Sequence, residues 1–429
     1  MYRRTLLYCS SLCLVVVGLF LAACGPFGGN SSVTPTPSQV ANASTRIAST
    51  GATIDQLTQD VLLNMHLHSW NPQAMTRNKV TGGLYINWKM SDPSITNNVR
   101  PGPDGNPLHN HDPQVDLFYL TTLAEYHQLH PQDSSFNSDL ARMTTVVLED
   151  FPAYSVPKGW IYFYLLNDGL LLHNRDLVNE AHTAANNFYT TWYNKKLGLV
   201  YDISHTPGDY GVDHSLMAGA ALIDAGQRWN ESNWVKAGEN DINHILAVAV
   251  DPKYGLFYNS MVVNANGQDA VQNYQAKPST QGQAVDALIT AYTLTHNTHY
   301  LDVASQVLQS LYSSGLWDSE QGGFFFAIDM KGGHLLTDYK ETRSQTLVLL
   351  ALHHFNQVRS QFTQQEQQLT SVIADHFYQS TYHGFFYRVT PDFRVYQSRA
   401  HVTGIGLEDF FTTEAMGSAL DALQTTELK

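Results

Sequence analysis

The sequence predicts an all-α fold, an (α/α)6 barrel of six helix pairs with short aromatic β-hairpins in the loops of one face. Three observations predict it: a repeated motif, a series of helical segments, and long loops before every second segment. The motif is a glycine followed by alternating apolar and aromatic residues. It returns at intervals of about 60 residues, or about twice that between its first two copies, which indicates a repeat architecture. The copies are GGLYINW (82–88), GLVY (198–201), GLFYNS (255–260), GGFFFAI (322–328) and GFFYRV (384–389).

Apolar spacing predicts the helices. In the segment 280–296, for example, Ala284, Leu288 and Ala291 fall on one helical face. Stretches such as 217–221 and 346–352 are apolar or small throughout, as expected of inner helices that touch both the outer ring and the barrel axis. The stretch GWIYFY, which begins at Gly159, is expected to belong to a helix. The twelve helices are expected at 54–68, 113–129, 134–151, 160–173, 176–193, 213–229, 232–248, 280–296, 299–312, 340–358, 363–379 and 407–424.

The long loops are expected to open on one face and to form a cup. Loops on a rigid scaffold usually carry binding residues, so the cup is the expected functional site. The loops are 80–112, 152–159, 198–212, 254–279, 315–339 and 383–406.

The N-terminus predicts an exported protein that is held to a membrane by lipid. Arg3 and Arg4 precede a short apolar stretch, and small residues lead to Cys24. This pattern resembles a bacterial lipoprotein signal peptide (1–23), which would be cleaved before Cys24 and leave that thiol to be lipidated, for example with palmitate. An uncleaved membrane helix is the alternative, but the apolar stretch is short for a span. Residues 24–49 are rich in Gly, Ser, Thr and Pro and predict a flexible stalk, which leaves 50–429 as the barrel domain of an extracytoplasmic, envelope-bound protein.

Composition excludes several classes of function. The chain is 43% hydrophobic and 14% charged, which is typical of a globular protein. Its net charge is −14 and it contains no basic run, which argues against binding to nucleic acid. Cys9 and Cys13 would leave with the signal peptide, so no disulfide or thiol nucleophile is expected in the domain. No nucleotide-binding, zinc-protease or serine-hydrolase motif occurs, so we expect no cofactor. We expect a monomer.

The glycine-aromatic hairpins and the paired helices over 54–425 resemble the six-hairpin glycosidase superfamily. That group includes family 76 and family 88 glycoside hydrolases and, more distantly, N-acylglucosamine 2-epimerases. The resemblance implies a glycan substrate and two carboxyl groups, of which one donates a proton and the other acts as nucleophile or activates water. Family 76 enzymes carry two adjacent aspartates at the start of an inner helix. The nearest match here is Glu408 and Asp409, where a glutamate replaces one aspartate and the flanking sequence GIGLEDFF differs.

The catalytic candidates lie in loops or in first turns of expected inner helices: Asp112, Asp213, Glu341, Glu408 and Asp409. Each has a structural alternative. Acids are favoured in a first turn by the helix dipole, Asp112 can cap a helix that begins at Pro113, and Glu341 can pair with Arg343 or Lys340.

The stretch HNHDPQVD places two histidines and two aspartates before or within the first inner helix. Asp112 and Asp116 share one helix face, and such a pair can hold a metal or raise one carboxyl pKa. The spacing matches no metal-binding motif, so we expect no metal.

Sugar binding calls for flat aromatic faces and hydrogen-bonding side chains. The expected substrate-binding residues are Tyr85, Trp88, His111, Asp116, Tyr210, His214, Gln281, Arg343 and His401. The aromatic residues among them can instead form a hairpin core.

Three functions remain open. The first is an exported, lipid-anchored glycoside hydrolase, mannanase-like, that acts on an oligo- or polysaccharide. The second is an epimerase-like enzyme that moves a proton with histidines such as His205, His214 and His401. The third is a non-catalytic glycan-binding lipoprotein.

Overall fold

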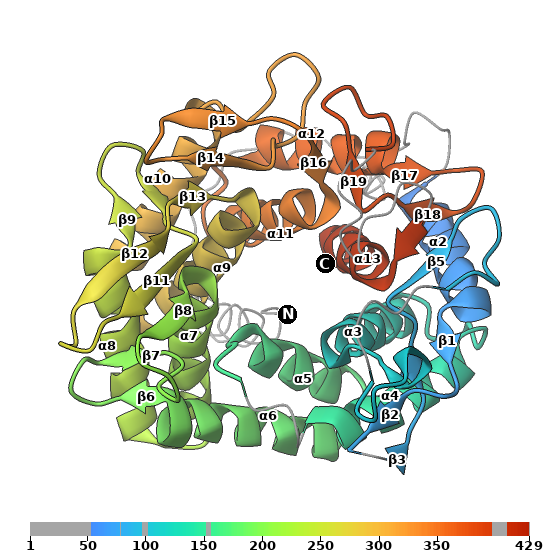
Figure 1. The fold of residues 1–429 in the computed structure, drawn as a ribbon, viewed down its shortest axis with the longest axis horizontal. Helices are drawn as coiled ribbons and strands as arrows, with labels where there is room; N and C mark the ends of the chain where they lie inside the picture. Colours follow the sequence, from blue (N-terminus) through green and yellow to red (C-terminus); the bar gives the residue numbers. More distant parts are fainter. Residues whose placement is uncertain (1–52, 78, 97–101, 152–155, 397–409, 429) are drawn as a thin grey trace, which may run out of the picture.

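The computed structural model describes residues 53–77, 79–96, 102–151, 156–396 and 410–428. Its helices form two concentric rings (Figure 1). Each helix of the inner ring contacts the next, and the last contacts the first, so the ring is closed. The inner helices are α3 (Pro113–Leu129), α5 (Trp160–Leu171), α7 (Val212–Arg228), α9 (Pro278–Thr295), α11 (Thr342–Val358) and α13 (Thr413–Glu427). The predicted (α/α)6 barrel is therefore confirmed.

Each outer helix packs on one inner helix. The outer helices are α2 (Ile54–His68) on α13, α4 (Asn137–Asp150) on α3, α6 (Arg175–Asn187) on α5, α8 (Ser232–Val248) on α7, α10 (Thr298–Ser313) on α9 and α12 (Thr363–Val372) on α11. The inner helices are buried along most of their length, as expected for the stretches 217–221 and 346–352. In the described part of the chain, no helix is both long enough and apolar enough to cross a bilayer.

Two groups of helix boundaries differ most from the prediction. The last inner helix begins at Thr413 and not at residue 407, because the aromatic and β-branched residues before it form strand β20 (Phe410–Thr412), which pairs with β5 (Asn87–Lys89). The segments 176–193 and 363–379 change from α-helix to short π-helical turns, η3 (Phe188–Trp192) and η4 (Ile373–Phe377), before they enter strands.

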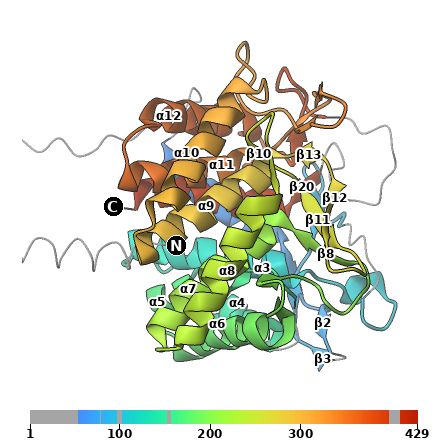
Figure 2. The ribbon, with the colours of Figure 1, turned by 90° about the vertical axis from the view of Figure 1, so that its left-hand side faces the viewer.

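The glycine-aromatic motifs form short antiparallel pairs on one face of the barrel, and the strands labelled in Figure 2 lie at the right of the helices. In all five copies a residue with positive φ comes just before the paired aromatic stretch: a glycine at 82, 198, 255 and 322, and His383 in the last copy. Glycine adopts this conformation without steric cost, which explains its recurrence. GWIYFY is the first half of α5, as expected.

The hairpin strands pair in a fixed pattern. Two-stranded pairs are β1 (Trp70–Asn71) with β4 (Gly83–Leu84), β2 (Met75–Thr76) with β3 (Lys79–Val80), β6 (Tyr193–Asn194) with β7 (Leu199–Val200), β9 (Val250–Asp251) with β10 (Leu256–Phe257), β16 (Lys340–Glu341) with β19 (Arg388–Val389), and β17 (Tyr378–Gln379) with β18 (Gly384–Phe385). Three-stranded sheets join β8 (Gly208–Gly211), β11 (Ser260–Val263) and β12 (Asp269–Asn273), and β13 (Gln275–Ala276), β14 (Ala327–Asp329) and β15 (His334–Leu336).

The inner helices hold these strands by a repeated contact. In five of the inner helices, the fourth residue bonds to the backbone of the neighbouring glycine-aromatic strand. We call this contact the strand clamp. It joins Asp116 to Leu84 N (2.8 Å), Ser215 to Val200 O (2.5 Å), Gln281 to Phe257 N and O (2.8 and 2.9 Å), Gln345 to Phe324 N and O (2.7 and 2.9 Å), and Met416 Sδ to Phe385 N (3.2 Å).

Candidate active site

Charged side chains gather where the inner helices begin, on the hairpin face of the barrel. We call these residues the mouth cluster: Asp112, Lys158, Asp213, Glu341, Arg343 and Glu414. Arg343 and Glu414 form an ion pair across two inner helices, with Arg343 Nη1 3.0 Å from Glu414 Oε1. Burial and then the charge of Arg343 lower the pKa of Lys158 below its ordinary value, while the charges of Asp112, Asp213 and Glu414 oppose this shift. The ring closure therefore brings acids and bases from separate helices to one place.

The carboxyl of Glu414 has a pKa above the ordinary value of a glutamate. Burial raises the pKa of its carboxyl, the charges of Glu341 and Asp112 raise it further, and only Arg343 lowers it. The side chain still exposes 22% of its surface to solvent. A carboxyl with a raised pKa that solvent or substrate can reach is suited to general acid catalysis.

Asp213 and His214 lie beside this ion pair, on the first turn of α7. Asp213 is buried and accepts one hydrogen bond from the backbone N–H of His214 (3.0 Å). Burial lowers the pKa of His214, and the positive charges of Lys158 and Arg343 lower it further, so its imidazole is neutral at pH 7. A neutral imidazole can accept a proton, so His214 adds a possible acceptor to the mouth.

Glu341 forms its ion pair with Arg388, and not with Arg343 or Lys340, the two partners considered from the sequence. Its Oε1 accepts hydrogen bonds from Arg388 Nε (3.2 Å) and Nη2 (3.0 Å). The Arg388 guanidinium also lies over the rings of Tyr339 and Tyr387, at 4.3 and 4.8 Å. Lys340 points away from the mouth, is fully buried, and donates to Asp318 Oδ2 at 2.8 Å. Glu341 is thus held in place, and its charge is compensated by Arg388.

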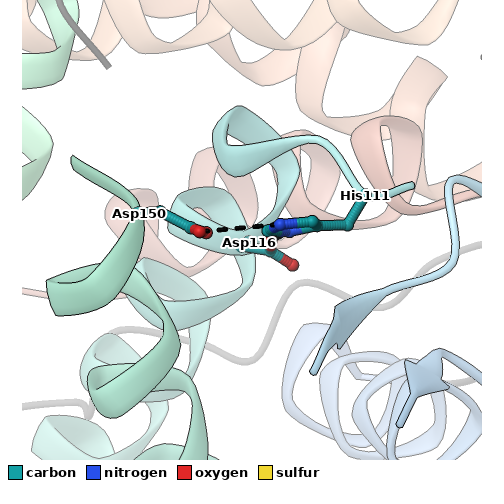
Figure 3. Close-up of side chains that lie close together, drawn as sticks. All are labelled: His111, Asp116 and Asp150. Atoms are coloured by element: carbon teal, nitrogen blue, oxygen red, sulfur yellow. Dashed lines mark hydrogen bonds and ion pairs between the residues drawn. The ribbon is translucent and has the colours of Figure 1, made fainter. Parts of the chain in front are cut away.

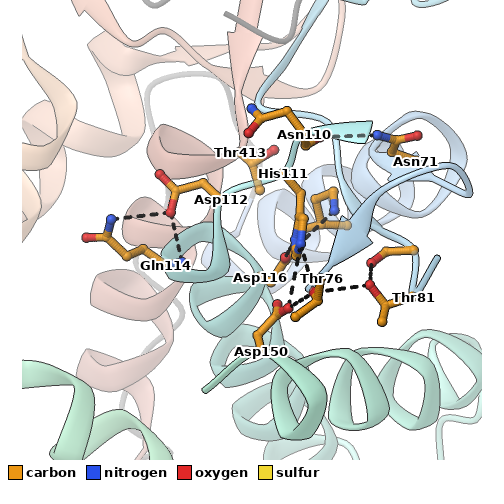
Figure 4. Close-up of polar contacts among 12 residues, drawn as sticks. Asn71, Thr76, Thr81, Asn110, His111, Asp112, Gln114, Asp116, Asp150 and Thr413 are labelled. Atoms are coloured by element: carbon orange, nitrogen blue, oxygen red, sulfur yellow. Dashed lines mark hydrogen bonds and ion pairs between the residues drawn. The ribbon is translucent and has the colours of Figure 1, made fainter. Parts of the chain in front are cut away.

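Asp112 caps α3, as the structural alternative predicted. Its carboxylate accepts from Gln114 N (3.0 Å) and Gln114 Nε2 (3.2 Å), and Figure 4 places it near Thr413, the first residue of α13. A capping aspartate with exposed surface can still contact a ligand, and its charge contributes to the raised pKa of Glu414.

Next to Asp112 lies a buried group, His111, Asp116 and Asp150 (Figure 3). His111 Nδ1 is 2.5 Å from Asp116 Oδ2, and its Nε2 is 3.5 Å from Asp150 Oδ1. Burial opposes the imidazolium charge, but Asp116 and Asp150 outweigh it and raise the pKa of His111 to about 9. Burial and the charge of Asp116 in turn raise the pKa of Asp150 to about 7. The three side chains are 5%, 0% and 0% exposed, which leaves no surface for a sugar.

The structure corrects five of the predicted substrate contacts. His111 and Asp116 are buried as described. Trp88 is fully buried and donates its indole N–H to Asn64 Oδ1 (3.2 Å). Tyr210 is buried in its hairpin and donates to Asp269 Oδ1 (2.7 Å), and Gln281 is a strand clamp. Asp116 and Gln281 hold the hairpins because short strands with few partners need side-chain hydrogen bonds for their backbone, and Trp88 and Tyr210 pack inside the hairpins.

Of the remaining predicted residues, Asp112, Asp213, His214, Glu341 and Arg343 are at or beside the mouth. Tyr85 is half-buried, and its carbonyl accepts from Thr413 Oγ1 at 2.6 Å. His205 lies in an exposed loop and contacts Asp202. Cys24, His401, Glu408 and Asp409 lie outside the described residues.

Sequence reasoning missed Glu414 and Asp150. Glu414 was missed because the last helix was expected to begin six residues earlier. The run FFTT before it, which favours a strand, is the signal that would have moved the helix start. Asp150 ends an outer helix, and no local pattern marks it.

The sequence matches the family model "D-glucuronyl C5-epimerase C-terminus" over residues 271–403, which is about a third of the chain. No curated protein is significantly similar in sequence.

Solved structures share the fold at low identity. An unsaturated glucuronyl hydrolase specific for heparin superposes with a TM-score of 0.65 and 14% identity over 87% of this chain and 96% of that one. A D-mannose isomerase gives 0.59 and 12% over 86% and 97%. An inactive variant of an α-1,6-mannanase from Salegentibacter, solved with α-1,6-mannotriose, gives 0.58 and 9% over 87% and 98%. The chain therefore has the six-hairpin glycosidase-like (α/α)6 fold, as its hairpins and paired helices predicted.

Proposed function

We propose that this protein is a carbohydrate-active enzyme that hydrolyses a glycosidic bond at the mouth cluster, with Glu414 as general acid and Asp213 as its partner carboxylate. The observation that carries the proposal is the partly exposed Glu414 carboxyl, held by Arg343 at 3.0 Å in a cluster that also contains the buried Asp213, and the raised pKa of Glu414 agrees with it. Glycoside hydrolysis needs such a pair, one carboxyl protonated and the other ionised. The shared fold supports the same direction, because solved proteins of this fold include hydrolases of glycosidic bonds.

The roles follow from the contacts. The Glu414 proton would pass to the leaving oxygen while Asp213 attacks the anomeric carbon or deprotonates the attacking water. Arg343 holds the Glu414 carboxyl by its 3.0 Å contact and keeps one oxygen directed. Lys158, whose ammonium contacts Gln114 Oε1 at 3.0 Å, is available to bind sugar hydroxyls.

Two substrate classes compete. The resemblance to family 76 favours an α-mannan, as predicted from the sequence. The matched family model and the glucuronyl hydrolase favour a glycan that contains a hexuronic acid. Arg343, Arg388 and Lys158 offer three cations for such a carboxylate, so we place the uronic acid glycan first.

A second candidate is epimerisation at C5 of a hexuronate residue. The matched model spans α9 to α12 and includes Glu341, Arg343, Tyr387 and Arg388. In that reaction a base removes the C5 proton next to the carboxylate, and an acid returns a proton to the opposite face. Burial raises the pKa of Tyr387, and the charges of Glu341 and Glu414 add to the rise, so Tyr387 is a protonated donor at pH 7.

The test is a substrate screen in D2O on the wild type, Glu414→Gln and Asp213→Asn. α-1,6-mannan and glucuronic acid-containing oligosaccharides are followed for new reducing ends and for deuterium at C5. Hydrolysis in the wild type, lost by about 100- to 10,000-fold in Glu414→Gln, is expected. The loss should shrink on an aryl glycoside with an activated leaving group, which needs no proton. Deuterium without new reducing ends would favour the epimerase, and binding without either product would favour the glycan-binding protein.

We also propose that the chain is exported and lipid-anchored through Cys24. The arginines, apolar stretch and small residues before Cys24 support this. Incorporation of labelled palmitate into the wild type but not into Cys24→Ala is expected. Equal labelling of both would contradict it.

A further inference from the structure

The buried group beside Asp112 has the composition of a metal site. Thr76 comes from β2, His111 from the residues before α3, Asp116 from α3 and Asp150 from the end of α4 (Figure 4). One imidazole nitrogen and one oxygen from each of two carboxylates all lie within 4.8 Å of one another. Imidazole and carboxylate together are typical ligands of Zn²⁺ and similar divalent ions.

The bonding of Asp150 is incomplete without a further partner. The residue is 1% exposed, its Oδ1 accepts a hydrogen bond from Thr76 Oγ1, and no donor among the described residues reaches its Oδ2. Two buried carboxylates face a single imidazole here, and buried charges in proteins are paired or coordinate metals. A divalent cation would compensate both carboxylates and use the unpaired oxygen.

The distances separate the atoms that are spaced as metal ligands from the carboxylate that orients His111. His111 Nε2 lies 3.5 Å from Asp150 Oδ1 and 3.2 Å from Thr76 Oγ1. The edge of a tetrahedron around a metal with bonds of about 2.0–2.1 Å is about 3.3 Å, so His111 Nε2 is spaced from each of these oxygens as ligands of one ion are. The two oxygens share a hydrogen bond, in which Thr76 Oγ1 donates to Asp150 Oδ1, and the ion would replace it. Asp116 lies on the other side of the ring, 2.5 Å from His111 Nδ1, and is itself fixed by Leu84 N at 2.8 Å. Carboxylates in that position orient metal-binding histidines.

We propose that this protein binds one Zn²⁺-like divalent ion through His111 Nε2, the Asp150 carboxylate and the Thr76 hydroxyl, with Asp116 as the group that orients His111. The ion would join the β2–β3 hairpin and the end of α4 to the residue that precedes Asp112. It would therefore position one carboxylate of the mouth cluster. The proposal does not depend on which glycan reaction occurs there.

The test uses the full-length chain in detergent after treatment with a chelator. Titration with Zn²⁺ in a calorimeter should give one equivalent, and Co²⁺ should give the visible absorption of a low-symmetry site. Asp150→Asn, which keeps the shape of the side chain, should weaken Zn²⁺ binding by more than about 100-fold, and Asp116→Asn by about 10- to 100-fold. The matched control is His353→Gln, because His353 contacts one acid, Glu366, at 2.9 Å, and belongs to no such group. It should bind as the wild type does.

The proposal is overturned by a wild type that binds no Zn²⁺ and no Co²⁺, since a proton then occupies the position of the metal. Equal affinity in the wild type and Asp150→Asn would also overturn it, as would equal loss in the control. Far-ultraviolet circular dichroism separates lost binding from lost folding. If Asp150→Asn does not fold, the stoichiometry and the Co²⁺ spectrum of the wild type decide.

Discussion

The strand clamp at Gln281 can be tested by a substitution that another repeat of the barrel already carries. Gln281 is fully buried, and its amide bonds both Phe257 N (2.8 Å) and Phe257 O (2.9 Å). We consider Gln281→Met because α13 already carries a methionine in this place, where Met416 Sδ accepts from Phe385 N at 3.2 Å. The thioether can replace the acceptor but not the donor, so Phe257 O would lose its partner. An unsatisfied buried group costs about 1–3 kcal/mol, and the weaker acceptor adds about 0.5–1 kcal/mol.

The free energy of unfolding should therefore fall by about 1.5–4 kcal/mol in Gln281→Met. For a domain of roughly 380 residues this corresponds to a fall in Tm of about 2–5 °C. Urea unfolding followed by circular dichroism measures it. Gln283→Met is the matched control: Gln283 is on the same helix and is also buried, but its Oε1 has no partner among the described residues. The control should change stability by less than about 1 kcal/mol. If both variants lose the same stability, the clamp is not what holds the hairpin.

Three further predictions test the mouth cluster and the packing of the protein around it. Glu341→Gln removes a charge that raises the pKa of Glu414, so the alkaline limb of the kcat/KM profile should move to lower pH; a move to higher pH would contradict the assignment of the acid. Lys340→Met leaves Asp318 buried without its 2.8 Å partner and should cost about 3–5 kcal/mol in urea unfolding, part of which the double variant with Asp318→Asn recovers; full additivity of the two single changes would refute the pair. Gly159→Ala should abolish folding on expression, because a Cβ there would lie 1.9 Å from Ala218 N; a soluble variant with wild-type Tm would show that α5 and α7 are less tightly packed.

The sequence alone predicted the architecture because the signals are local. Helical periodicity and the glycine with positive φ act over a few residues, so helices and hairpins were identified from short stretches. The same logic located Asp112, Asp213, Glu341 and Arg343 near helix starts, and a ring of helices that all start on one face brings those positions together.

The incorrect predictions have a related cause, because a short stretch of sequence does not show its contacts with distant segments. Glu414 was missed because strand β20 exists only through its pairing with β5, more than 300 residues away. Trp88 and Tyr210 looked like sugar platforms, but burial against partners from other segments makes them core residues. Gln281 and Asp116 are polar residues at a helix start, and composition cannot distinguish a side chain that binds a strand from one that binds a ligand.

What the sequence determined by itself is the set of elements: the twelve α-helices found among the described residues, their pairing, and the hairpins between them. What only the tertiary structure decided is which polar groups meet. Asp150, at the end of an outer helix, reaches His111 and Asp116, and Arg343 reaches Glu414 across two inner helices. Such contacts depend on ring closure between segments distant in the chain, and their electrostatics depend on burial, which no spacing rule along the sequence contains.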